Sequence, residues 1–216
     1  AILLALTFGL TSIGEKVVYA DRSFFAVHLV RDRYGFRELL HGTTLHGKQR
    51  LTDDPVLRNT PITYYSPPSG VGKVFAAFND TPKFDHVAVV GLGTGTIAGF
   101  GRAGQTIDYY EIDPSIERLA RGPLFSYVRE SKAQINVVIG DARLRLAKAA
   151  PGQYGLIVLD AFSSDSIPVH LLTLEAMRTY MDKLRSDGIL VVHTSNRFLK
   201  LVPVVKANAK IGRAHV

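Results

Sequence analysis

The stretch His86-Val-Ala-Val-Val-Gly-Leu-Gly-Thr-Gly-Thr96 decides the fold of this chain. Residues 87–90 form a short, continuous run of apolar and mostly β-branched side chains, which is typical of an interior strand of a parallel sheet. Glycines follow at every second position, as Gly91, Gly93 and Gly95. Because glycine lets the backbone turn sharply and approach a ligand closely, we expect a buried strand, a glycine turn and then a helix over about residues 96–102.

A carboxylate lies at the end of the next predicted strand, Ile107–Glu111, twenty residues after Gly91. An acidic residue at this spacing accepts hydrogen bonds from ribose hydroxyls, which indicates an adenosine-bearing cofactor. A dinucleotide fingerprint has a third glycine where this chain has Thr96. The pattern G-x-G-x-G is closer to the nucleoside turn of S-adenosylmethionine enzymes, although a glycine turn with a purely structural role remains the alternative.

Three more buried strands are predicted, at Ile135–Ile139, Tyr154–Asp160 and Gly188–His193. Strands that alternate with helices predict an α/β fold with a doubly wound, mostly parallel sheet, the Rossmann-like fold of S-adenosylmethionine methyltransferases. Ligands bind beyond the carboxyl ends of such strands, where the glycine turn, Glu111, Asp141 and Asp160 all fall. Asp141 either caps the helix expected over about residues 141–148 or accepts the exocyclic amine of adenine.

The chain divides into four segments: an apolar segment at 1–14, a small β-rich domain at 15–80, the nucleoside-binding α/β domain at 81–210, and a probable non-native scar at 211–216. In the β-rich domain, strands are expected at Phe24–Val30 and Phe36–Leu40. The α/β domain normally adds two strands after the last helix, so we interpret the fold as truncated at its C-terminus.

The apolar run Ala1–Ile13 is shorter than the ~20 residues of a membrane-spanning helix. Basic residues follow it, as they do on the cytoplasmic side of a membrane. We interpret the run as the end of a transmembrane helix, with a buried helix or a signal core as alternatives. The expected location is therefore the cell membrane with the catalytic domain on the cytoplasmic side, and otherwise the cytoplasm.

Composition excludes several classes of protein. The 216 residues contain no cysteine, so disulfides, a thiolate nucleophile and a cysteine metal site are excluded. The net charge is +7, but the basic residues are spread along the chain and are not clustered with aromatic residues, so no nucleic-acid partner is expected. The histidines lack metal-ligand spacing, no metal is expected, and we interpret His41 and His46 as structural or exposed.

Several segments in order resemble the spermidine synthase (polyamine aminopropyltransferase) family, and especially its membrane-fused bacterial members. They are the glycine turn, Glu111-Ile-Asp-Pro114, Gly140-Asp-Ala142, Leu159–Pro168, and, upstream, Leu40–Gln49 with Tyr64-Tyr65. The resemblance covers about residues 20–206. It implies decarboxylated S-adenosylmethionine, or S-adenosylmethionine itself, as co-substrate, a small-molecule amine such as putrescine as acceptor, and membrane attachment. The oligomeric state stays open, with a homodimer as one alternative.

Combined with this resemblance, the residues give a set of site predictions. The cofactor-binding residues are expected to be Gln49, Gly91, Gly93, Gly95, Glu111 and Asp141, and the substrate-binding residues Tyr64, Tyr65 and Asp165. An ammonium substrate has an ordinary pKa of roughly 10, so a base must take its proton before it can attack. Asp160, at the tip of a buried strand, is the expected catalytic base. Asp165 has helix capping as its alternative role.

Two departures from the family pattern keep other functions open. Soluble synthases usually carry an aspartate inside the glycine turn, where this chain has Thr94, and their tight aspartate–serine signature is stretched here to Asp160–Asp165. One alternative is a small-molecule methyltransferase that uses S-adenosylmethionine. The other is a domain of a membrane protein that senses polyamines or nucleosides without catalysis.

Overall fold

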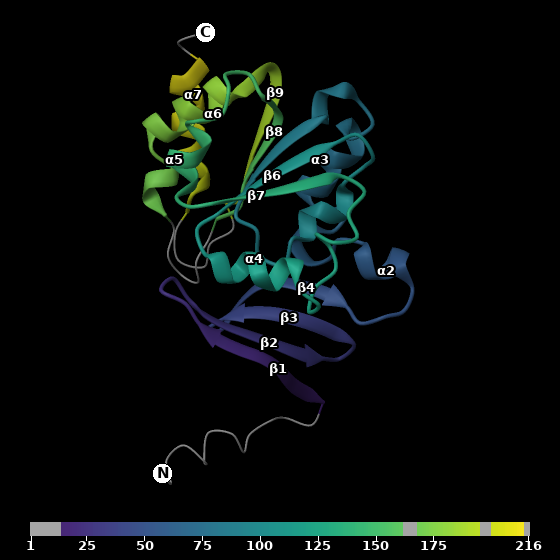
Figure 1. Cartoon of the computed structure of the whole chain (residues 1–216). Helices are drawn as coiled ribbons and strands as arrows, with labels where there is room; N and C mark the ends of the chain where they lie inside the picture. Colours follow the sequence, from purple (N-terminus) through teal and green to yellow (C-terminus); the bar gives the residue numbers. More distant parts are fainter. Residues whose placement is uncertain (1–13, 162–167, 195–199, 214–216) are drawn as a thin grey trace.

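The computed structural model describes residues 14–161, 168–194 and 200–213, with side chains up to residue 208. These residues form two sheets, one stacked below the other in Figure 1. The smaller sheet is antiparallel and the larger one is parallel, as the sequence predicts. The expected membrane segment at residues 1–13 lies outside the described residues.

The N-terminal sheet is a meander of four antiparallel strands. Its strands follow each other in chain order: β1 (Glu15–Arg22), β2 (Val27–Arg33), β3 (Phe36–His41) and β4 (Thr44–Arg50). Two-residue turns join the last three strands. At Tyr34 and Gly35 both φ angles are positive, 50° and 76°, as in the turn type whose twist matches that of a hairpin.

The five parallel strands run in the spatial order β7-β6-β5-β8-β9. They are β5 (His86–Val90), β6 (Thr106–Glu111), β7 (Gln134–Ile139), β8 (Tyr154–Leu159) and β9 (Leu184–Val192). After β7 the chain crosses back over the sheet to place β8 on the other side of β5. The gap between the carboxyl ends of β5 and β8 is therefore the topological switch point, where ligands bind in open α/β sheets.

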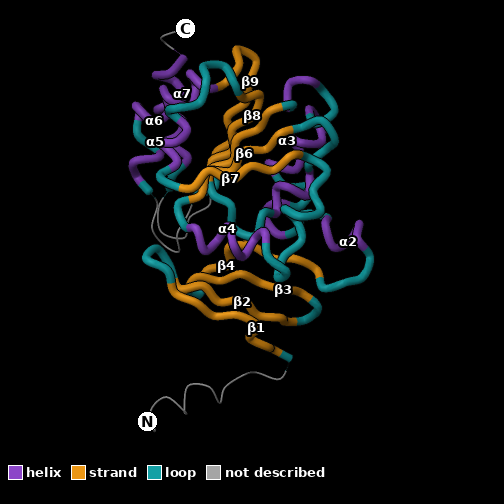
Figure 2. Tube along the Cα trace, viewed as in Figure 1, coloured by secondary structure: helices purple, strands orange, loops and turns teal. Residues whose placement is uncertain are grey.

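Helices cover both faces of the parallel sheet (Figures 1 and 2). The α-helices are α2 (Pro55–Asn59), α3 (Gly70–Phe78), α4 (Pro114–Arg121), α5 (Ala142–Leu146), α6 (Leu174–Lys183) and α7 (Val202–Arg213). Short 3₁₀ helices are η1 (Thr63–Tyr65), η2 (Pro82–Phe84), η3 (Thr96–Phe100) and η4 (Val169–Leu171). Side chains of α3 and α4 pack in one hydrophobic core, and those of α5 and α6 pack in another.

The residues of β5 divide between these two cores. Val87 and Val89 lie in the core with α3 and α4, whereas Ala88 and Val90 lie in the core with α5 and α6. Successive side chains of a strand point to opposite faces, so a strand that is covered on both sides must be apolar throughout. This requirement explains why the central strand is a continuous apolar run without alternation.

Three helices differ in detail from the prediction. The helix expected over 96–102 is the short 3₁₀ helix η3, which ends at Phe100. The helix expected over 141–148 is α5, and Asp141 caps it by accepting a hydrogen bond from the Leu144 N–H at 3.0 Å. The last helix, α7, continues to Arg213 and therefore includes the first residues of the segment interpreted as a scar.

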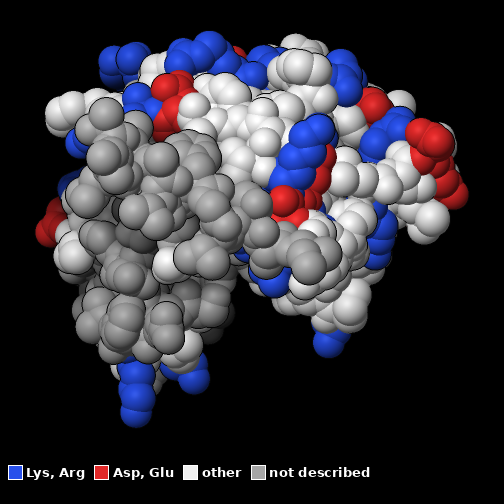
Figure 3. Space-filling model, turned by 90° about the horizontal axis from the view of Figure 1, so that it is seen from below, with Lys and Arg blue, Asp and Glu red and all other residues white. Residues whose placement is uncertain are grey.

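The surface carries mixed charge. On the face in Figure 3, Lys and Arg lie among acidic and uncharged residues and do not form one continuous basic patch. Within the described part of the chain, no helix is both long enough and apolar enough to cross a bilayer.

Gly155 provides a test of how closely β8 packs against η2. A Cβ added at Gly155 would lie 1.4 Å from the Lys83 carbonyl oxygen, which is backbone and cannot rotate away. Gly155→Ala should therefore lower the free energy of unfolding by ~3 kcal/mol, the upper end of the usual cost of overpacking. Gly70→Ala is the matched control, since nothing lies within 4 Å of its Cβ. Equal urea midpoints for the two variants would contradict this packing.

Candidate functional site

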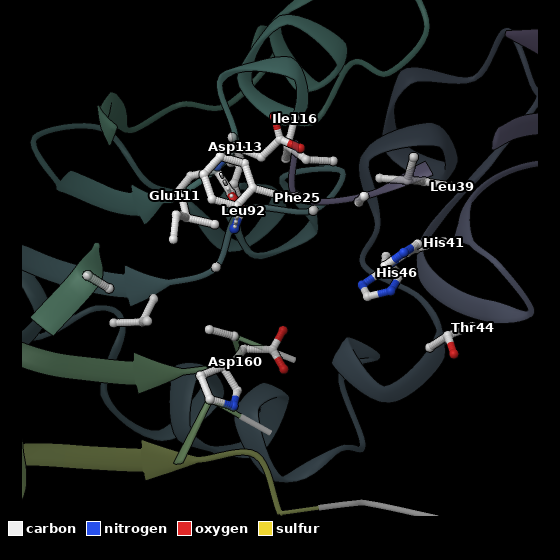
Figure 4. A pocket seen from close by; sticks show the side chains of 18 of the residues that line it. Phe25, Leu39, His41, Thr44, His46, Leu92, Glu111, Asp113, Ile116 and Asp160 are labelled. Carbon is white, nitrogen blue, oxygen red and sulfur yellow. Dashed lines mark hydrogen bonds between the residues drawn. The ribbon is translucent and has the colours of Figure 1, made fainter. Parts of the chain in front are cut away.

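A cavity of about 540 Å³ lies between the N-terminal sheet and the carboxyl edge of the parallel sheet. One wall comes from the ends of β5, β6 and β8, and the other from β3, β4 and the turn between them. Figure 4 shows Asp160 and Glu111 on the side of the parallel sheet and His41, His46 and Thr44 on the facing side. The cavity therefore lies at the predicted edge.

The glycine turn after β5 is enclosed by backbone on two sides. A Cβ at Gly91 (φ +97°) would lie 2.6 Å from the Asp160 carbonyl oxygen, and one at Gly93 (φ +53°) would lie 2.8 Å from the His46 carbonyl oxygen. Any other residue would clash and would also strain the backbone at these positive φ angles. Gly91 and Gly93 both line the cavity, and Gly93 brings its two walls together.

Glu111 lies at the end of β6 with its carboxylate facing this turn. Its two oxygens accept hydrogen bonds from the backbone N–H groups of Leu92 and Asp113, each at 2.9 Å. Burial raises the pKa of the Glu111 carboxyl, and the backbone N–H groups of Asp113, Leu92 and Ile112 oppose this shift. Each carboxylate oxygen has two lone pairs, so the group retains acceptor capacity toward the cavity that it lines. This geometry suits a ribose hydroxyl.

Asp160 follows β8, and both of its carboxylate oxygens are engaged. The Tyr65 hydroxyl donates to Oδ2, and His193 Nδ1 is hydrogen-bonded to Oδ1. The ring of Tyr64 lies 4.2 Å from that of Tyr65 and 4.8 Å from that of His193, measured between centroids. The fold thus brings together three predicted residues, Asp160, Tyr64 and Tyr65, on the cavity wall.

The environment of Asp160 is nearly dry. The exposed fraction of its side chain is 7%. Burial raises the pKa of the Asp160 carboxyl, while the hydrogen bond and the charge of His193 lower it. A carboxyl whose pKa is raised by burial holds a proton more readily near neutral pH than an exposed one, which suits a general base.

The facing wall carries two histidines, His41 and His46, which we interpret from the sequence as structural or exposed residues. Both line the cavity, with ring centroids 5.8 Å apart. Burial and the neighbouring His41 lower the pKa of His46 to about 4, so its imidazole is neutral at physiological pH. Among the described residues, the buried His46 Nε2 atom has no hydrogen-bond partner. This polar atom is suited to a ligand group.

Asp141 has the first of the two roles that the sequence left open, and its place on the cavity wall is compatible with the second. It caps α5, and it also lines the cavity beside His170, whose Nε2 lies 3.2 Å from Asp141 Oδ2. Both carboxylate oxygens are therefore engaged, Oδ1 by the Leu144 N–H and Oδ2 by His170, and each keeps a second lone pair. Capping of α5 does not exclude a contact with an adenine amine, which stays a prediction.

Gln49 and Gly95 are not among the residues that line this cavity, and their role as cofactor contacts stays a prediction. Both ends of the Gln49 amide are hydrogen-bonded within the fold. Its Nε2 donates to Ser126 Oγ at 2.8 Å, and its Oε1 accepts from the Ser126 N–H at 3.0 Å. A Cβ at Gly95 would lie 2.4 Å from Val128 Cγ2, so this glycine is required for packing. Thr94 likewise packs against Gly47, away from the cavity.

Asp165, the third predicted substrate residue, lies outside the described residues. His193 is a residue of the cavity wall that the sequence does not single out. It ends the predicted strand Gly188–His193 at the same sheet edge as Asp160, and this position is the signal that could identify it. Within the described part of the chain, no group of three His, Asp or Glu side chains has the arrangement of a metal site.

The fold and the site define the class of protein: a Rossmann-like methyltransferase fold preceded by a small antiparallel sheet, with a cavity between the two. No protein-family model matches the chain. A polyamine aminopropyltransferase from Vibrio vulnificus (strain CMCP6) is 29% identical over 192 residues, which cover 85% of this chain and 61% of that enzyme. The chain thus spans about three fifths of the length of this relative.

Solved structures support the same fold. A probable spermidine synthase from Corynebacterium glutamicum ATCC 13032 aligns with a TM-score of 0.67 and 17% identity, over 95% of this chain and 71% of that one. The spermidine synthase from Thermotoga maritima aligns with a TM-score of 0.59 and 16% identity, over 92% of this chain and 64% of that one. These structures confirm the predicted fold class, and the sequence similarity supports the resemblance to spermidine synthases.

The geometry of Glu111 predicts a specific loss of affinity. Glu111→Ala removes a charged acceptor from the cavity and should weaken binding of methylthioadenosine by ~1–3 kcal/mol, the usual value of a hydrogen bond to a charged group. Titration calorimetry measures the change. Glu117→Ala, on the outer side of α4 where the side chain pairs with Arg121, is the control and should bind like the unaltered protein. Unchanged affinity in Glu111→Ala would remove this residue from the nucleoside site.

Gln49→Ala gives the opposite pattern in the same experiment. The buried Ser126 N–H would lose its acceptor, so the free energy of unfolding should fall by ~1–3 kcal/mol, while the affinity of the folded protein for methylthioadenosine stays the same. A selective loss of affinity with normal stability would instead support Gln49 as a cofactor contact.

Proposed function

We propose that this chain is the catalytic part of an aminopropyltransferase, which transfers the aminopropyl group of decarboxylated S-adenosylmethionine to a small amine such as putrescine. The observation that carries the proposal is the shared cavity. A buried carboxylate with a tyrosine partner, Asp160 with Tyr65, and an acceptor for a nucleoside, Glu111, line the same cavity at the switch point of the sheet. The similarity to a polyamine aminopropyltransferase supports the same reaction.

The proposed reaction requires one proton transfer and one substitution at carbon. Asp160 accepts a proton from the ammonium group of the acceptor, which leaves a neutral amine. The nitrogen lone pair attacks the aminopropyl carbon bonded to the sulfonium. The bond between carbon and sulfur breaks, and its electron pair stays on sulfur, so that neutral methylthioadenosine leaves. Atoms and charge balance without a metal or a redox partner.

The surroundings of Asp160 support its role as the base. The side chain is nearly excluded from water, so a proton taken from the amine is not exchanged at once with solvent. Tyr64 and Tyr65 present aromatic rings beside the carboxylate, and aromatic faces attract ammonium groups. An ammonium group placed here would contact both the carboxylate and a ring.

The nucleoside is proposed to lie along the carboxyl ends of β5, β6 and β7. Glu111 would accept hydrogen bonds from the ribose hydroxyls, and Asp141 would accept one from the adenine amine. The backbone of Gly91 and Gly93 permits close approach of the ligand, since no side chain stands there. This arrangement leaves the sulfonium between the glycine turn and Asp160, where substitution would occur.

Attachment to a membrane is a separate proposal, based on the apolar run Ala1–Ile13 and the basic residues that follow it. The natural gene product should sediment with membranes and be released by detergent, not by 1 M salt, which screens surface charge. Recovery of the natural gene product in the supernatant without detergent would contradict the proposal.

Asp160→Asn tests the mechanism. The amide retains the shape of the side chain but cannot accept the ammonium proton, so turnover should fall by ~10²–10⁴-fold, the usual contribution of general-base catalysis. Affinity for methylthioadenosine should change little. The defect should shrink as the pH rises toward the pKa of the amine, roughly 10, because the acceptor then arrives deprotonated. Turnover of the natural gene product is measured with decarboxylated S-adenosylmethionine and putrescine.

The control is Asp187→Asn, an exposed carboxylate on β9 paired with Arg185, which should keep full activity. Near-normal aminopropyl transfer by Asp160→Asn at neutral pH would reject the mechanism. Turnover of S-adenosylmethionine, and not of its decarboxylated form, would instead identify the protein as a methyltransferase. Binding of the nucleoside without turnover of either compound would favour a sensing domain.

A further inference from the structure

His193 lies directly beside Asp160 because of the register of two parallel strands. Leu159 of β8 pairs with Val192 of β9, and the His193 N–H donates to the Leu159 carbonyl oxygen at 2.9 Å. Asp160 and His193 are thus the first residues beyond two neighbouring strands. Adjacent residues of paired parallel strands project to the same face of the sheet, so the two side chains must lie together.

The alternation of side chains along β8 and β9 shows toward which face of the sheet Asp160 and His193 project. Val158 packs in the core with α3 and α4, where Tyr65 also lies, whereas Leu159 packs in the core with α5 and α6. The next position returns to the first face. Asp160 and His193 therefore project toward η1, where Tyr64 and Tyr65 lie beside them.

The hydrogen bond between these two side chains has a defined direction while Asp160 is ionised. A carboxylate can only accept, so His193 Nδ1 carries the hydrogen and donates to Oδ1. The Tyr65 hydroxyl donates to the other oxygen. Two donors on two different oxygens fix the plane of the carboxylate and leave one lone pair on each oxygen for a substrate.

We propose that His193 is a positioning residue for the base: its imidazole orients the Asp160 carboxylate and keeps it in the form that accepts a proton. The proposal rests on the proposed aminopropyl transfer and goes beyond it, because it assigns a residue that acts through Asp160. His193 is suited to this role because its side chain is more exposed than that of Asp160, 24% against 7%, so the donor itself is less desolvated.

The electrostatic reason is the burial of Asp160. Burial raises the pKa of the Asp160 carboxyl, and the hydrogen bond from His193 is the larger of the two effects that lower it. If this bond is lost, the carboxyl holds its own proton up to a higher pH and cannot take one from the substrate. Activity should then fall at the acid end of the pH profile and recover in more alkaline solution.

Other titratable groups near the pair must be considered in such a test. Tyr64 and Tyr65 face it from η1, and Tyr64 stays neutral because burial and the charge of Asp160 raise the pKa of its phenol. The remaining titratable groups on the cavity wall are His28, His41, His46, Tyr110, Glu111, Asp113, Asp141 and His170. Variants at His193 leave all of these groups in place.

The experiment compares three variants of the natural gene product. His193→Leu removes the donor, whereas His193→Asn retains an amide N–H near the position of Nδ1. His86→Leu is the matched control: it removes another histidine bonded to a carboxylate, Asp108, at 2.8 Å, at the opposite end of the sheet. The acid limb of the pH profile of kcat/KM is measured for each variant.

We expect the acid limb to move up by about one pH unit in His193→Leu, which is about a tenfold loss of activity below the limb. His193→Asn should lie close to the unaltered protein, and His86→Leu should not move the limb. A superimposable profile for His193→Leu, or an equal shift in His193→Asn and His193→Leu, would overturn the proposal.

A second measurement does not depend on activity. Titration of the ¹³C-labelled aspartate carboxyls by NMR, with Asp160 assigned through Asp160→Asn, should give a higher Asp160 pKa in His193→Leu than in the unaltered protein. An unchanged value would overturn the role of His193 even if no aminopropyl transfer is found. A raised value together with absent aminopropyl transfer would reject the proposed function and leave the positioning of the carboxylate intact.

Discussion

The close approach of β5 and β8 at their carboxyl ends is the constraint on which the site depends. The Asp160 N–H donates to the Val90 carbonyl oxygen at 2.8 Å, and only a glycine at position 91 leaves room for the Asp160 backbone. A side chain at Gly91 would push β8 away and take the Asp160 carboxylate with it. The glycine turn and Asp160 are therefore coupled through contacts between the β5 and β8 backbones.

The N-terminal sheet forms the second wall of the cavity, and β4 packs against the glycine turn. The His46 carbonyl oxygen packs on Gly93, and Thr94 packs on Gly47. These contacts between backbone and small residues hold β4 over the turn, so that a cavity forms at the edge of the parallel sheet. At position 94 the buried threonine has its hydroxyl hydrogen-bonded to that of Thr96, at 2.8 Å.

Each buried carboxylate on the cavity wall accepts hydrogen bonds from protein donors. These bonds offset the cost of removing a charged group from water. Backbone N–H groups bind Glu111, His28 binds Asp113 at 2.8 Å, and Tyr65 with His193 binds Asp160. The donors differ in kind, so the carboxylates differ in basicity. Backbone donors are fixed, whereas the side-chain donors at Asp160 allow its basicity to be adjusted by substitution.

The sequence by itself determined the sheet, the glycine turn and the positions of Glu111, Asp141 and Asp160, because an apolar run, a glycine pattern and a strand end are local properties of the chain. Only the tertiary structure decided the partners of these residues. The sequence does not show that the Gln49 amide binds Ser126 or that the His193 ring binds Asp160. Such contacts join strands through their register and packing, and no spacing along the chain specifies which side chain will meet which.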